Sequence, residues 1–319
     1  MSKLLITGAT GFLGSKLCSN LKFKNYLIHA SVRSDNQAIT ENNFFFFNVG
    51  AINSKTKWST ALSGIECVIH CAARAHVMKD KRKNILTSYR EINVDGTRNL
   101  AIQAAMSGVK RFIFISSIKV NGESTIGSSS FKISDIPQPE DAYGISKWEA
   151  EQALWEISKQ TGLEIIIIRP PLIYGHGVKG NLLRLLDLIY RGVPLPLAGI
   201  QNSRSFLGLQ NLIDLIVLCI DHPKAPGNTF LIADKECIST SDLISKLQKI
   251  MKKPSRLFSV PTNLVKLAGL LTGKSIEVKR LLSSLKIDSS HAYKVLDWTP
   301  LITLEEGLEK TVKWYLKSR

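Results

Sequence analysis

Short apolar segments alternate with helical patterns through the first half of the chain. Helical spacing of apolar residues predicts helices at Phe12–Leu21, Ser54–Leu62, Glu91–Met106 and Ala142–Gln160. Apolar runs without polar alternation, typical of strands covered on both faces, separate them at Lys3–Thr7, Tyr26–Val32, Phe44–Val49, Cys67–His70, Phe112–Ser116 and Leu163–Ile168. Strands that alternate with helices are joined by crossovers, so the pattern predicts an α/β fold with a doubly wound parallel sheet.

The pattern changes after Ile168. Arg169-Pro170-Pro171 ends the last strand, and glycines at 175, 177 and 180 indicate a loop. Helical patterns follow at Asn181–Arg191, Gln210–Asp221, Ser241–Met251, Thr262–Leu271 and from Leu304 to the end. We therefore predict a sheet domain over residues 1–174, with a possible return segment at 206–232, and a smaller, mostly helical C-terminal lobe over residues 175–319.

Composition limits the class of protein and of partner. The 319 residues are 44% hydrophobic and 21% charged, which is ordinary for a globular protein, and 42 Lys+Arg against 26 Asp+Glu give a net charge of +16. Such a surplus favours an anionic partner: nucleic acid, an acidic membrane face or a phosphorylated small molecule. The chain start has no signal-peptide pattern, and no apolar run reaches the roughly 18 residues of a membrane span. Five cysteines without a C-x-x-C pair favour a reducing compartment, so we expect a cytoplasmic protein.

A glycine-rich turn follows the first predicted strand and opens the first helix. It reads Gly8-Ala9-Thr10-Gly11-Phe12-Leu13-Gly14. Glycines allow a tight turn and a close backbone approach, and the free N–H groups of the helix N-terminus favour a pyrophosphate. The order strand, glycines, helix therefore predicts a dinucleotide site.

The end of the second strand bears on which dinucleotide binds. An NAD site usually has an acidic residue there, about 20 residues after the glycines. This chain has Ser31-Val32-Arg33 and no acid before Asp35. Arg33, assisted by Ser31, would pair with a 2′-phosphate, which favours NADP and leaves NAD possible; the alternative is that Arg33 is an ordinary surface cation.

A tyrosine and a lysine lie four residues apart at the start of a predicted helix. Tyr143 and Lys147 therefore share one helix face, and an ammonium beside a phenol lowers the tyrosine pKa toward the range of proton transfer. Ser116-Ser117 ends the strand that precedes them, at the sheet edge where ligands bind in open α/β sheets. A serine there can hydrogen-bond a carbonyl oxygen whose charge changes.

These motifs together carry a resemblance to a known family. The other matching segments are His70-Cys71-Ala72-Ala73, Asn93-Val94-Asp95-Gly96-Thr97, Arg169-Pro170-Pro171-Leu172-Ile173-Tyr174-Gly175 and Arg204-Ser205-Phe206-Leu207. Over nearly its whole length the chain resembles the extended short-chain dehydrogenase/reductase family, in the nucleotide-sugar epimerase and dehydratase branch. The resemblance implies a Rossmann domain that binds NAD(P), a C-terminal substrate lobe and a homodimer.

The resemblance also implies a role for individual residues. Tyr143 would be the catalytic acid/base, Lys147 would hold the nicotinamide ribose, and Ser117 rather than Ser116 would contact the reacting oxygen. Substrate contacts are expected at Ser117, Lys119, Asn181 and Arg204, the last because a guanidinium donates in pairs to phosphate. Cofactor contacts are expected at Gly8, Gly11, Phe12, Leu13, Gly14, Ser31, Arg33, Asn48, Val49, Cys71, Ala72, Ala73, Asn93, Tyr143, Lys147 and Pro170.

The chain departs from the epimerase pattern at four places. Leu172 stands where an asparagine is frequent, Asn48 where an aspartate commonly contacts adenine, and Lys119 where a threonine often lies beside the sugar. Val32-Arg33 replaces the acid that selects NAD. The Leu172 departure leaves one sugar-nucleotide contact missing or replaced, and the non-acidic Ser31–Arg33 segment suits a reductase that uses NADPH.

The resemblance implies hydride transfer at C4 of a UDP-activated hexose, for which we expect an N-acetylated sugar. We expect 4-keto reduction in the synthesis of a surface-polysaccharide precursor, similar to reductases that make UDP-6-deoxy-N-acetylhexosamines. The alternatives are a UDP-glucose or UDP-N-acetylglucosamine 4-epimerase and, in another class, a non-catalytic dinucleotide sensor. The retained Ser117, Tyr143 and Lys147 argue against the sensor.

Other partners are weaker hypotheses. The cluster Lys79–Lys83 lacks interleaved aromatic residues and predicts a solvated loop rather than a nucleic-acid site. His70, His76 and His176 do not lie near other ligand types, so no metal site is expected. Val265–Leu271, with Lys274, Lys279 and Arg280, has the pattern of a basic, apolar-faced helix, so peripheral membrane association stays an alternative to packing within the lobe.

Overall fold

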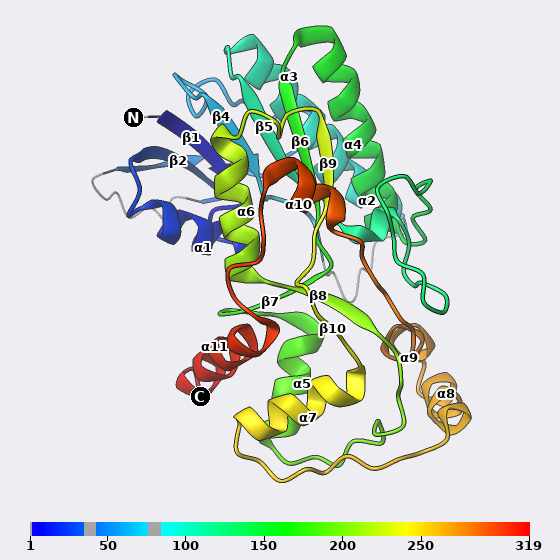
Figure 1. The fold of residues 1–319 in the computed structure, drawn as a ribbon. Helices are drawn as coiled ribbons and strands as arrows, with labels where there is room; N and C mark the ends of the chain where they lie inside the picture. The colour runs from blue at the N-terminus through cyan, green and yellow to red at the C-terminus, as the bar shows by residue number, and fades with distance from the viewer. Residues whose placement is uncertain (1, 35–42, 76–83) are drawn as a thin grey trace.

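The computed structural model describes residues 2–34, 43–75 and 84–319, and it divides into a sheet domain and a smaller lobe (Figure 1). His76 and the Lys79–Lys83 cluster lie outside the described residues. The sheet domain contains a seven-stranded parallel sheet in the order β3-β2-β1-β4-β5-β6-β9. Its strands are β1 (Ser2–Thr7), β2 (Tyr26–Val32), β3 (Phe44–Asn48), β4 (Cys67–His70), β5 (Arg111–Ile115), β6 (Glu164–Arg169) and β9 (Asn228–Leu231). The predicted doubly wound α/β fold is therefore confirmed.

Helices cover both faces of this sheet. One face packs on α1 (Phe12–Leu21), α6 (Leu209–Asp221) and α10 (Ser290–Leu296). The other packs on α3 (Gly96–Met106), α4 (Ala142–Thr161) and the turns around Trp58, which is fully buried. Because both faces are covered, the central strands are apolar throughout: Ile165, Ile166, Ile167 and Ile168 of β6 have no exposed surface. The chain reverses its winding between β1 and β4, where doubly wound sheets leave a crevice at their carboxyl ends.

Two predicted helices of the sheet domain differ in the structure. Ser54–Leu62 forms turns instead of a helix. The side chains of Asn53 and Thr56 accept hydrogen bonds from nearby backbone N–H groups, which competes with helix formation. The predicted Glu91–Met106 helix is extended and divided into α2 (Ile85–Arg90), a π-helical turn η2 (Glu91–Asp95) and α3.

The lobe combines helices with a small sheet. Its three strands are β7 (Leu172–Tyr174), β8 (Arg204–Gly208) and β10 (Cys237–Ile238), in the order β10-β8-β7. Its helices are α5 (Gly180–Tyr190), α7 (Thr240–Ile250), α8 (Thr262–Leu271), α9 (Ser275–Leu282) and α11 (Leu304–Lys317). Part of the segment 206–232 returns to the main domain, since α6 covers the large sheet and β9 extends it, whereas β8 stays in the small one. The lobe lies below the carboxyl ends of the main strands (Figure 1).

Candidate active site

The glycine-rich turn between β1 and α1 is packed too closely for side chains. Gly8 has a φ of +67°, and a Cβ on it would lie 2.9 Å from the backbone of Ala72 at the end of β4. A Cβ on Gly14 would lie 2.2 Å from the carbonyl oxygen of Gly8. Gly11 is the N-cap of α1 and offers no side chain to the first N–H groups of the helix. The turn therefore leaves those N–H groups available to an anion, and it fits a dinucleotide pyrophosphate.

A buried polar chain holds the neighbouring turn at the end of β4. Thr7 Oγ1 lies 2.6 Å from His70 Nδ1, and His70 Nε2 lies 2.9 Å from Thr97 Oγ1. Thr7 Oγ1 also accepts a hydrogen bond from the backbone N–H of Ala72 at 3.2 Å. Burial lowers the pKa of His70 to about 3, so its ring is neutral and structural. These hydrogen bonds hold the turn Cys71-Ala72-Ala73 opposite the glycine-rich turn.

The remaining expected cofactor residues divide into exposed and enclosed positions. Arg33 and Asn48 are exposed at the carboxyl ends of β2 and β3, whereas Ser31 is 3% exposed. Leu13 is buried in the core, whereas Phe12 is half-buried and packs against the core. Val49 is half-buried beside the end of β3, and Pro170 is buried at the end of β6, where its carbonyl accepts from Ile118 N.

Asn93 has a positioning role in this structure. Its amide nitrogen donates to the carbonyl of Arg74 at 3.1 Å and to Ser146 Oγ at 2.9 Å, and its oxygen accepts from Arg74 N at 2.8 Å. The side chain is 1% exposed. Asn93 thus ties the loop after Ala73 to the start of α4.

The two serines after β5 have different surroundings. Ser116 is 3% exposed, and its hydroxyl donates to the buried Glu151 carboxylate. Ser117 is half-buried and caps the short 3-10 turn η3 (Ile118–Val120), where its Oγ accepts from Lys119 N at 3.3 Å. Of the pair, Ser117 is the one whose hydroxyl is free to donate to another molecule.

Tyr143 lies in the first turn of α4, beside the Ser117 turn. Asp141 caps this helix by accepting from Gly144 N at 2.8 Å, and a Cβ on Gly144 would lie 2.7 Å from the carbonyl of Lys119. The Tyr143 ring packs edge-on against Tyr89, with centroids 6.1 Å apart. The close packing at Gly144 fixes the tyrosine relative to the carboxyl end of β5.

Lys147 completes the arrangement but in a different way from the sequence-based expectation. Its ammonium is buried, donates to the carbonyl of Ile115 at 2.8 Å and lies 4.3 Å from the centre of the Phe114 ring. Burial lowers the pKa of Lys147 to about 7. Burial, together with the charge of Asp141, raises the pKa of Tyr143 above its usual range. The expected lowering of the Tyr143 pKa by Lys147 is therefore absent from this structure, because desolvation penalises both charged forms.

A buried ion pair, Arg169–Glu151, links the strands and the helix that carry the site residues. Arg169, at the end of β6, contacts Glu151 of α4 through Nη2 at 2.5 Å and Nε at 3.0 Å, and donates to Asn121 Oδ1 at 2.9 Å. Glu151 is fully buried and also accepts from Ser116. The network joins β6 and α4 to Ser116 and Asn121, which lie on either side of the Ser117 turn in the chain.

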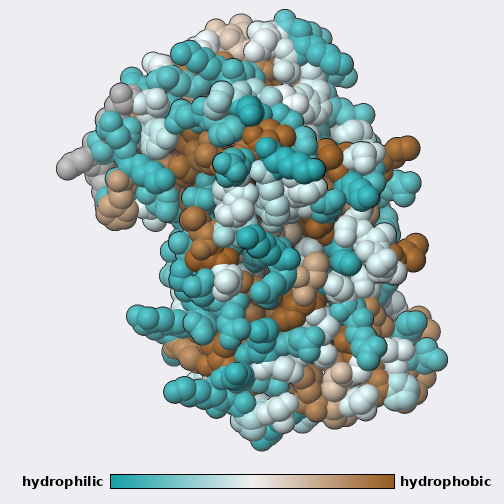
Figure 2. Space-filling view, in the orientation of Figure 1, coloured by the Kyte–Doolittle hydropathy of each residue, from teal (hydrophilic) through white to brown (hydrophobic). Residues whose placement is uncertain are grey.

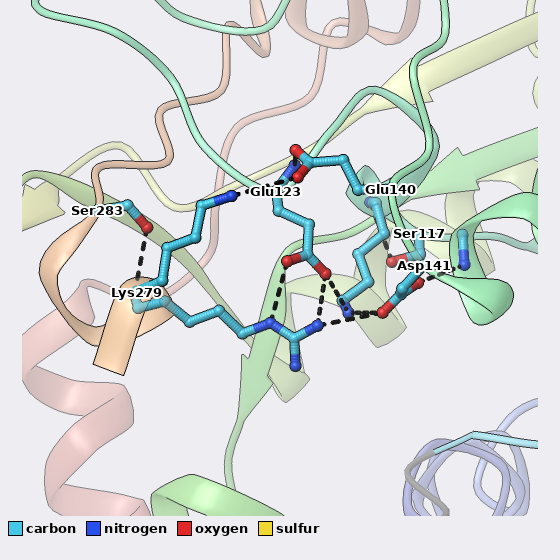
Figure 3. Close-up of polar contacts among 9 residues, drawn as sticks. Ser117, Glu123, Glu140, Asp141, Lys279 and Ser283 are labelled. Atoms are coloured by element: carbon cyan, nitrogen blue, oxygen red, sulfur yellow. Dashed lines mark hydrogen bonds and ion pairs between the residues drawn. The ribbon is translucent and has the colours of Figure 1, made fainter. Parts of the chain in front are cut away.

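A charged cluster connects the sheet domain to the lobe (Figure 3). Lys119 pairs with Asp141 and, at 2.9 Å, with Glu123. Arg280 of α9 reaches across from the lobe and contacts the same two carboxylates, at 2.5 Å from Glu123 and 3.2 Å from Asp141. The ammonium of Lys119, expected to contact substrate, is thus held by two carboxylates.

Arg204 and Asn181, the other expected substrate residues, lie in the lobe. Arg204 Nη1 donates to the carbonyls of Arg280 and Ser283, each at 2.7 Å, and burial and Arg280 lower its pKa. Two guanidinium side chains, Arg204 and Arg280, therefore lie close together. Asn181 is exposed in the first turn of α5.

Arg280 was the main residue that sequence reasoning did not assign to the site. In the sequence, Arg280 is noticeable only as one of several cations in the segment after Val265. Asp141 could have been found, because it stands just before a predicted helix and has the pattern of an N-cap. Within residues 2–34, 43–75 and 84–319, no group of three or more His, Cys, Asp or Glu could hold a metal ion. In the same ranges, every helix is too short or too polar to cross a bilayer.

Comparison with known proteins decides the family. Residues 4–233 match the model of the NAD dependent epimerase/dehydratase family. The chain belongs to this family. The family assignment covers the glycine-rich turn, the Tyr143–Lys147 pair and β9, and it identifies the protein as an enzyme of the nucleotide-sugar epimerase branch.

Individual members of the epimerase/dehydratase family match over nearly their whole length. A UDP-glucose 4-epimerase of Vibrio cholerae is 46% identical over 99% of this chain and 96% of its own. An N-acetyl-alpha-D-glucosaminyl-diphospho-ditrans,octacis-undecaprenol 4-epimerase of Escherichia coli O157:H7 is 26% identical over 98% and 94%. The structure of a Bacillus cereus UDP-glucuronic acid 4-epimerase in complex with UDP-glucuronic acid and NAD is 25% identical, with a TM-score of 0.81 over 99% of this chain and all of its own.

Proposed function

We propose that this enzyme interconverts the C4 epimers of a UDP-activated hexose. The observation that carries the proposal is the grouping of Ser117, Tyr143 and Lys147 at the carboxyl end of β5, where Lys147 donates to the Ile115 carbonyl and Gly144 packs on the Lys119 carbonyl. The 46% identical relative, a UDP-glucose 4-epimerase, favours epimerisation over the 4-keto reduction expected from the sequence. A hexose with or without an N-acetyl group fits the proposal.

The residues of the site have distinct tasks in this reaction. The glycine-rich turn and the end of β4 would hold NAD, which would supply the hydride acceptor and donor for C4 of the sugar. Tyr143, as the phenolate, would take the proton of the C4 hydroxyl when C4 is oxidised, and as the phenol it would return the proton when the 4-keto sugar is reduced. Because burial and Asp141 raise the pKa of Tyr143 in the free enzyme, this step requires the phenolate to be stabilised when cofactor and substrate are bound. Ser117 donates a hydrogen bond to the C4 oxygen, and Lys147, held at Ile115, supplies positive charge beside Tyr143 when protonated.

Arg204 and Arg280 would bind the diphosphate of the substrate. Guanidinium groups suit phosphate because they donate paired hydrogen bonds. Arg280 contacts Glu123 and Asp141 in this structure, so a diphosphate would compete with these carboxylates for it. Asn181 and Lys119, with Ser117, would line the sugar side of the same cleft.

The direct test combines two assays of the purified enzyme. In the first, UDP-glucose and UDP-N-acetylglucosamine are each incubated without added cofactor, and the C4 epimers are measured by NMR. In the second, NADPH or NADH is incubated with UDP-4-keto-6-deoxy-N-acetylglucosamine, and the absorbance of the reduced cofactor is followed. We expect epimers in the first assay. Stoichiometric oxidation of cofactor in the second, with no epimer in the first, would instead identify the reductase; silence in both with cofactor bound would favour a sensor.

We also propose NAD as the cofactor. Ser31 is almost fully enclosed in β2, which leaves it little surface for a 2′-phosphate, and the 25% identical Bacillus cereus structure contains NAD. The NADP preference inferred from Arg33 finds no support in the comparisons. An epimerase that regenerates its cofactor in each cycle has no need of the NADPH pool.

Exchange of Arg33 for aspartate tests the cofactor. We expect denatured wild-type enzyme to release NAD, and Arg33→Asp to change NAD binding by no more than about threefold, because NAD has no 2′-phosphate for the exposed guanidinium to contact. Titration of the apoenzyme with NAD and NADP measures both affinities. Two results would show that Arg33 selects the 2′-phosphate. The first is release of NADP from the wild type, and the second is a wild type that binds NADP more tightly than NAD and whose NADP affinity falls more than its NAD affinity in Arg33→Asp.

A further inference from the structure

Helices α8 and α9 form a hairpin at the edge of the lobe, and α9 is the principal partner of α8 (Figure 1). Their contact is close: a Cβ on Gly269 would lie 2.7 Å from Val278 Cγ2. Gly269 is the one buried residue of α8, and α9 has none. The two helices therefore meet through one narrow seam, α9 is held to the rest of the protein by Lys279 and Arg280, and the outer side of α8 has no cover in the described structure.

That outer side is apolar. Leu264, Leu267 and Leu271 are spaced by three and four residues, so they share the helix face opposite the Gly269 seam. The exposed fractions are 54% for Leu264, 49% for Leu267, 68% for the flanking Leu270, 78% for Leu271 and 61% for Ile276. Figure 2 shows hydrophobic side chains at the surface of this corner, mixed with hydrophilic ones. Single exposed leucines are common, but a continuous face of them indicates an interaction surface.

Cations accompany this apolar face. Residues 262–282 contain Lys266, Lys274, Lys279 and Arg280 and one acid, Glu277. Lys279 and Arg280 turn toward Glu140, Glu123 and Asp141 of the sheet domain. Lys266 and Lys274 are exposed and lie next to the leucines in the chain. Lys266 lies on the half of α8 nearer Gly269, and Lys274 follows the end of the helix. Leucines on one face of an exposed helix with lysines on its polar side are the pattern of helices that lie in a membrane interface.

We propose that the α8–α9 hairpin docks this enzyme on the surface of a bilayer that contains anionic lipids. The leucines enter the boundary between headgroups and acyl chains, and Lys266 and Lys274 contact the headgroups. Charge decides against a second copy of the chain, because two such hairpins would bring like-charged lysines together in a protein with a net charge of +16. The proposal does not rest on the proposed reaction, because it uses the leucines, Lys266 and Lys274 and not Arg280, the residue of this hairpin that we assign to the substrate diphosphate.

Sedimentation with lipid vesicles tests the docking. Wild-type enzyme is mixed with vesicles of phosphatidylcholine alone or of phosphatidylcholine and phosphatidylglycerol in equal amounts, and the bound fraction is measured. We expect binding to the anionic vesicles only, and a decrease in the partition constant of about tenfold in both Leu267→Asp/Leu271→Asp and Lys266→Glu/Lys274→Glu. Two control variants should bind like wild type. Ile126→Asp, at an exposed residue outside the hairpin, is the control for the leucine variant, and Lys24→Glu, on the sheet domain, is the control for the lysine variant.

Three outcomes would overturn the proposal. The first is no sedimentation of wild type with anionic vesicles. The second is that the leucine double variant binds anionic vesicles as wild type does and that salt releases both proteins completely, which would mean that the protein adsorbs through its charge alone. The third is a concentration-dependent dimer that Leu267→Asp/Leu271→Asp abolishes, which would make the face a protein interface. Because the substituted side chains are exposed, circular dichroism should confirm that every variant is folded.

Discussion

Replacing Tyr143 with phenylalanine is expected to lower kcat for C4 epimerisation by about 10²–10⁴-fold, the usual contribution of a positioned acid/base. The ring would stay in place, because it packs against Tyr89 and because the helix start is fixed by Asp141 and Gly144. Only the hydroxyl that exchanges the proton is lost. Steady-state kinetics with the substrate found active in the epimerase assay measure the effect, and cofactor content per protein should not change.

The matched control for this prediction is Tyr26→Phe. The Tyr26 hydroxyl donates to Asp221 at 3.0 Å, at the amino-terminal edge of the sheet and away from the crevice. Its loss should leave kcat unchanged. If Tyr143→Phe kept kcat within tenfold of wild type, another group would have to move the proton, and Tyr143 would lose its role.

Replacing Glu151 with alanine is expected to lower the free energy of unfolding by about 3–5 kcal/mol, because it leaves a buried charge without its partner. Arg169 is enclosed on all sides, and Glu151 receives two of its nitrogens as well as the Ser116 hydroxyl. Urea denaturation of wild type and variant measures the difference. Glu151→Gln keeps the shape and part of the hydrogen bonding, so its loss should be smaller.

The same helix supplies the control. Glu149 of α4 pairs with Arg90 at 2.5 Å, but the pair is exposed to solvent. Glu149→Ala should therefore cost about 1 kcal/mol or less, because water screens and solvates exposed ion pairs. Equal losses for Glu149→Ala and Glu151→Ala would mean that burial does not distinguish the two pairs and that the Glu151 network does not hold the site.

The Ser116–Ser117 pair illustrates how far sequence reasoning reached within the site. Counting along the chain placed a serine at the end of β5, and both residues are there. Which of the two hydroxyls is available depends on Glu151, which lies 35 residues further along and accepts from Ser116. Arg280 is a similar case, because it meets Glu123 and Asp141 only through the folding of the lobe onto the sheet domain. Local pattern contains no information about such long-range partners.

The failure at Ser54–Leu62 has the same origin. Helical spacing of its apolar residues is real, since Trp58, Ala61 and Leu62 are all buried against the sheet. The backbone nevertheless forms turns, because Asn99 and Gln103 of α3 both donate to the carbonyl of Thr56 and Gln103 accepts from Trp58 N. Side chains from another helix thus satisfy backbone groups that a helix would have paired internally.

The sequence by itself determined the parallel α/β architecture, the glycine-rich turn and the family. Unbroken apolar strands, glycines and the Tyr143–Lys147 spacing express short-range requirements of burial, backbone conformation and helix geometry. Only the tertiary structure decided the state of the charged groups. Lys147 lies at Ile115 with a pKa lowered to about 7, Lys119 is held by two carboxylates, and Arg280 reaches the site from the lobe. Desolvation and ion pairing depend on which groups the fold brings together, and these groups come from segments far apart in the chain.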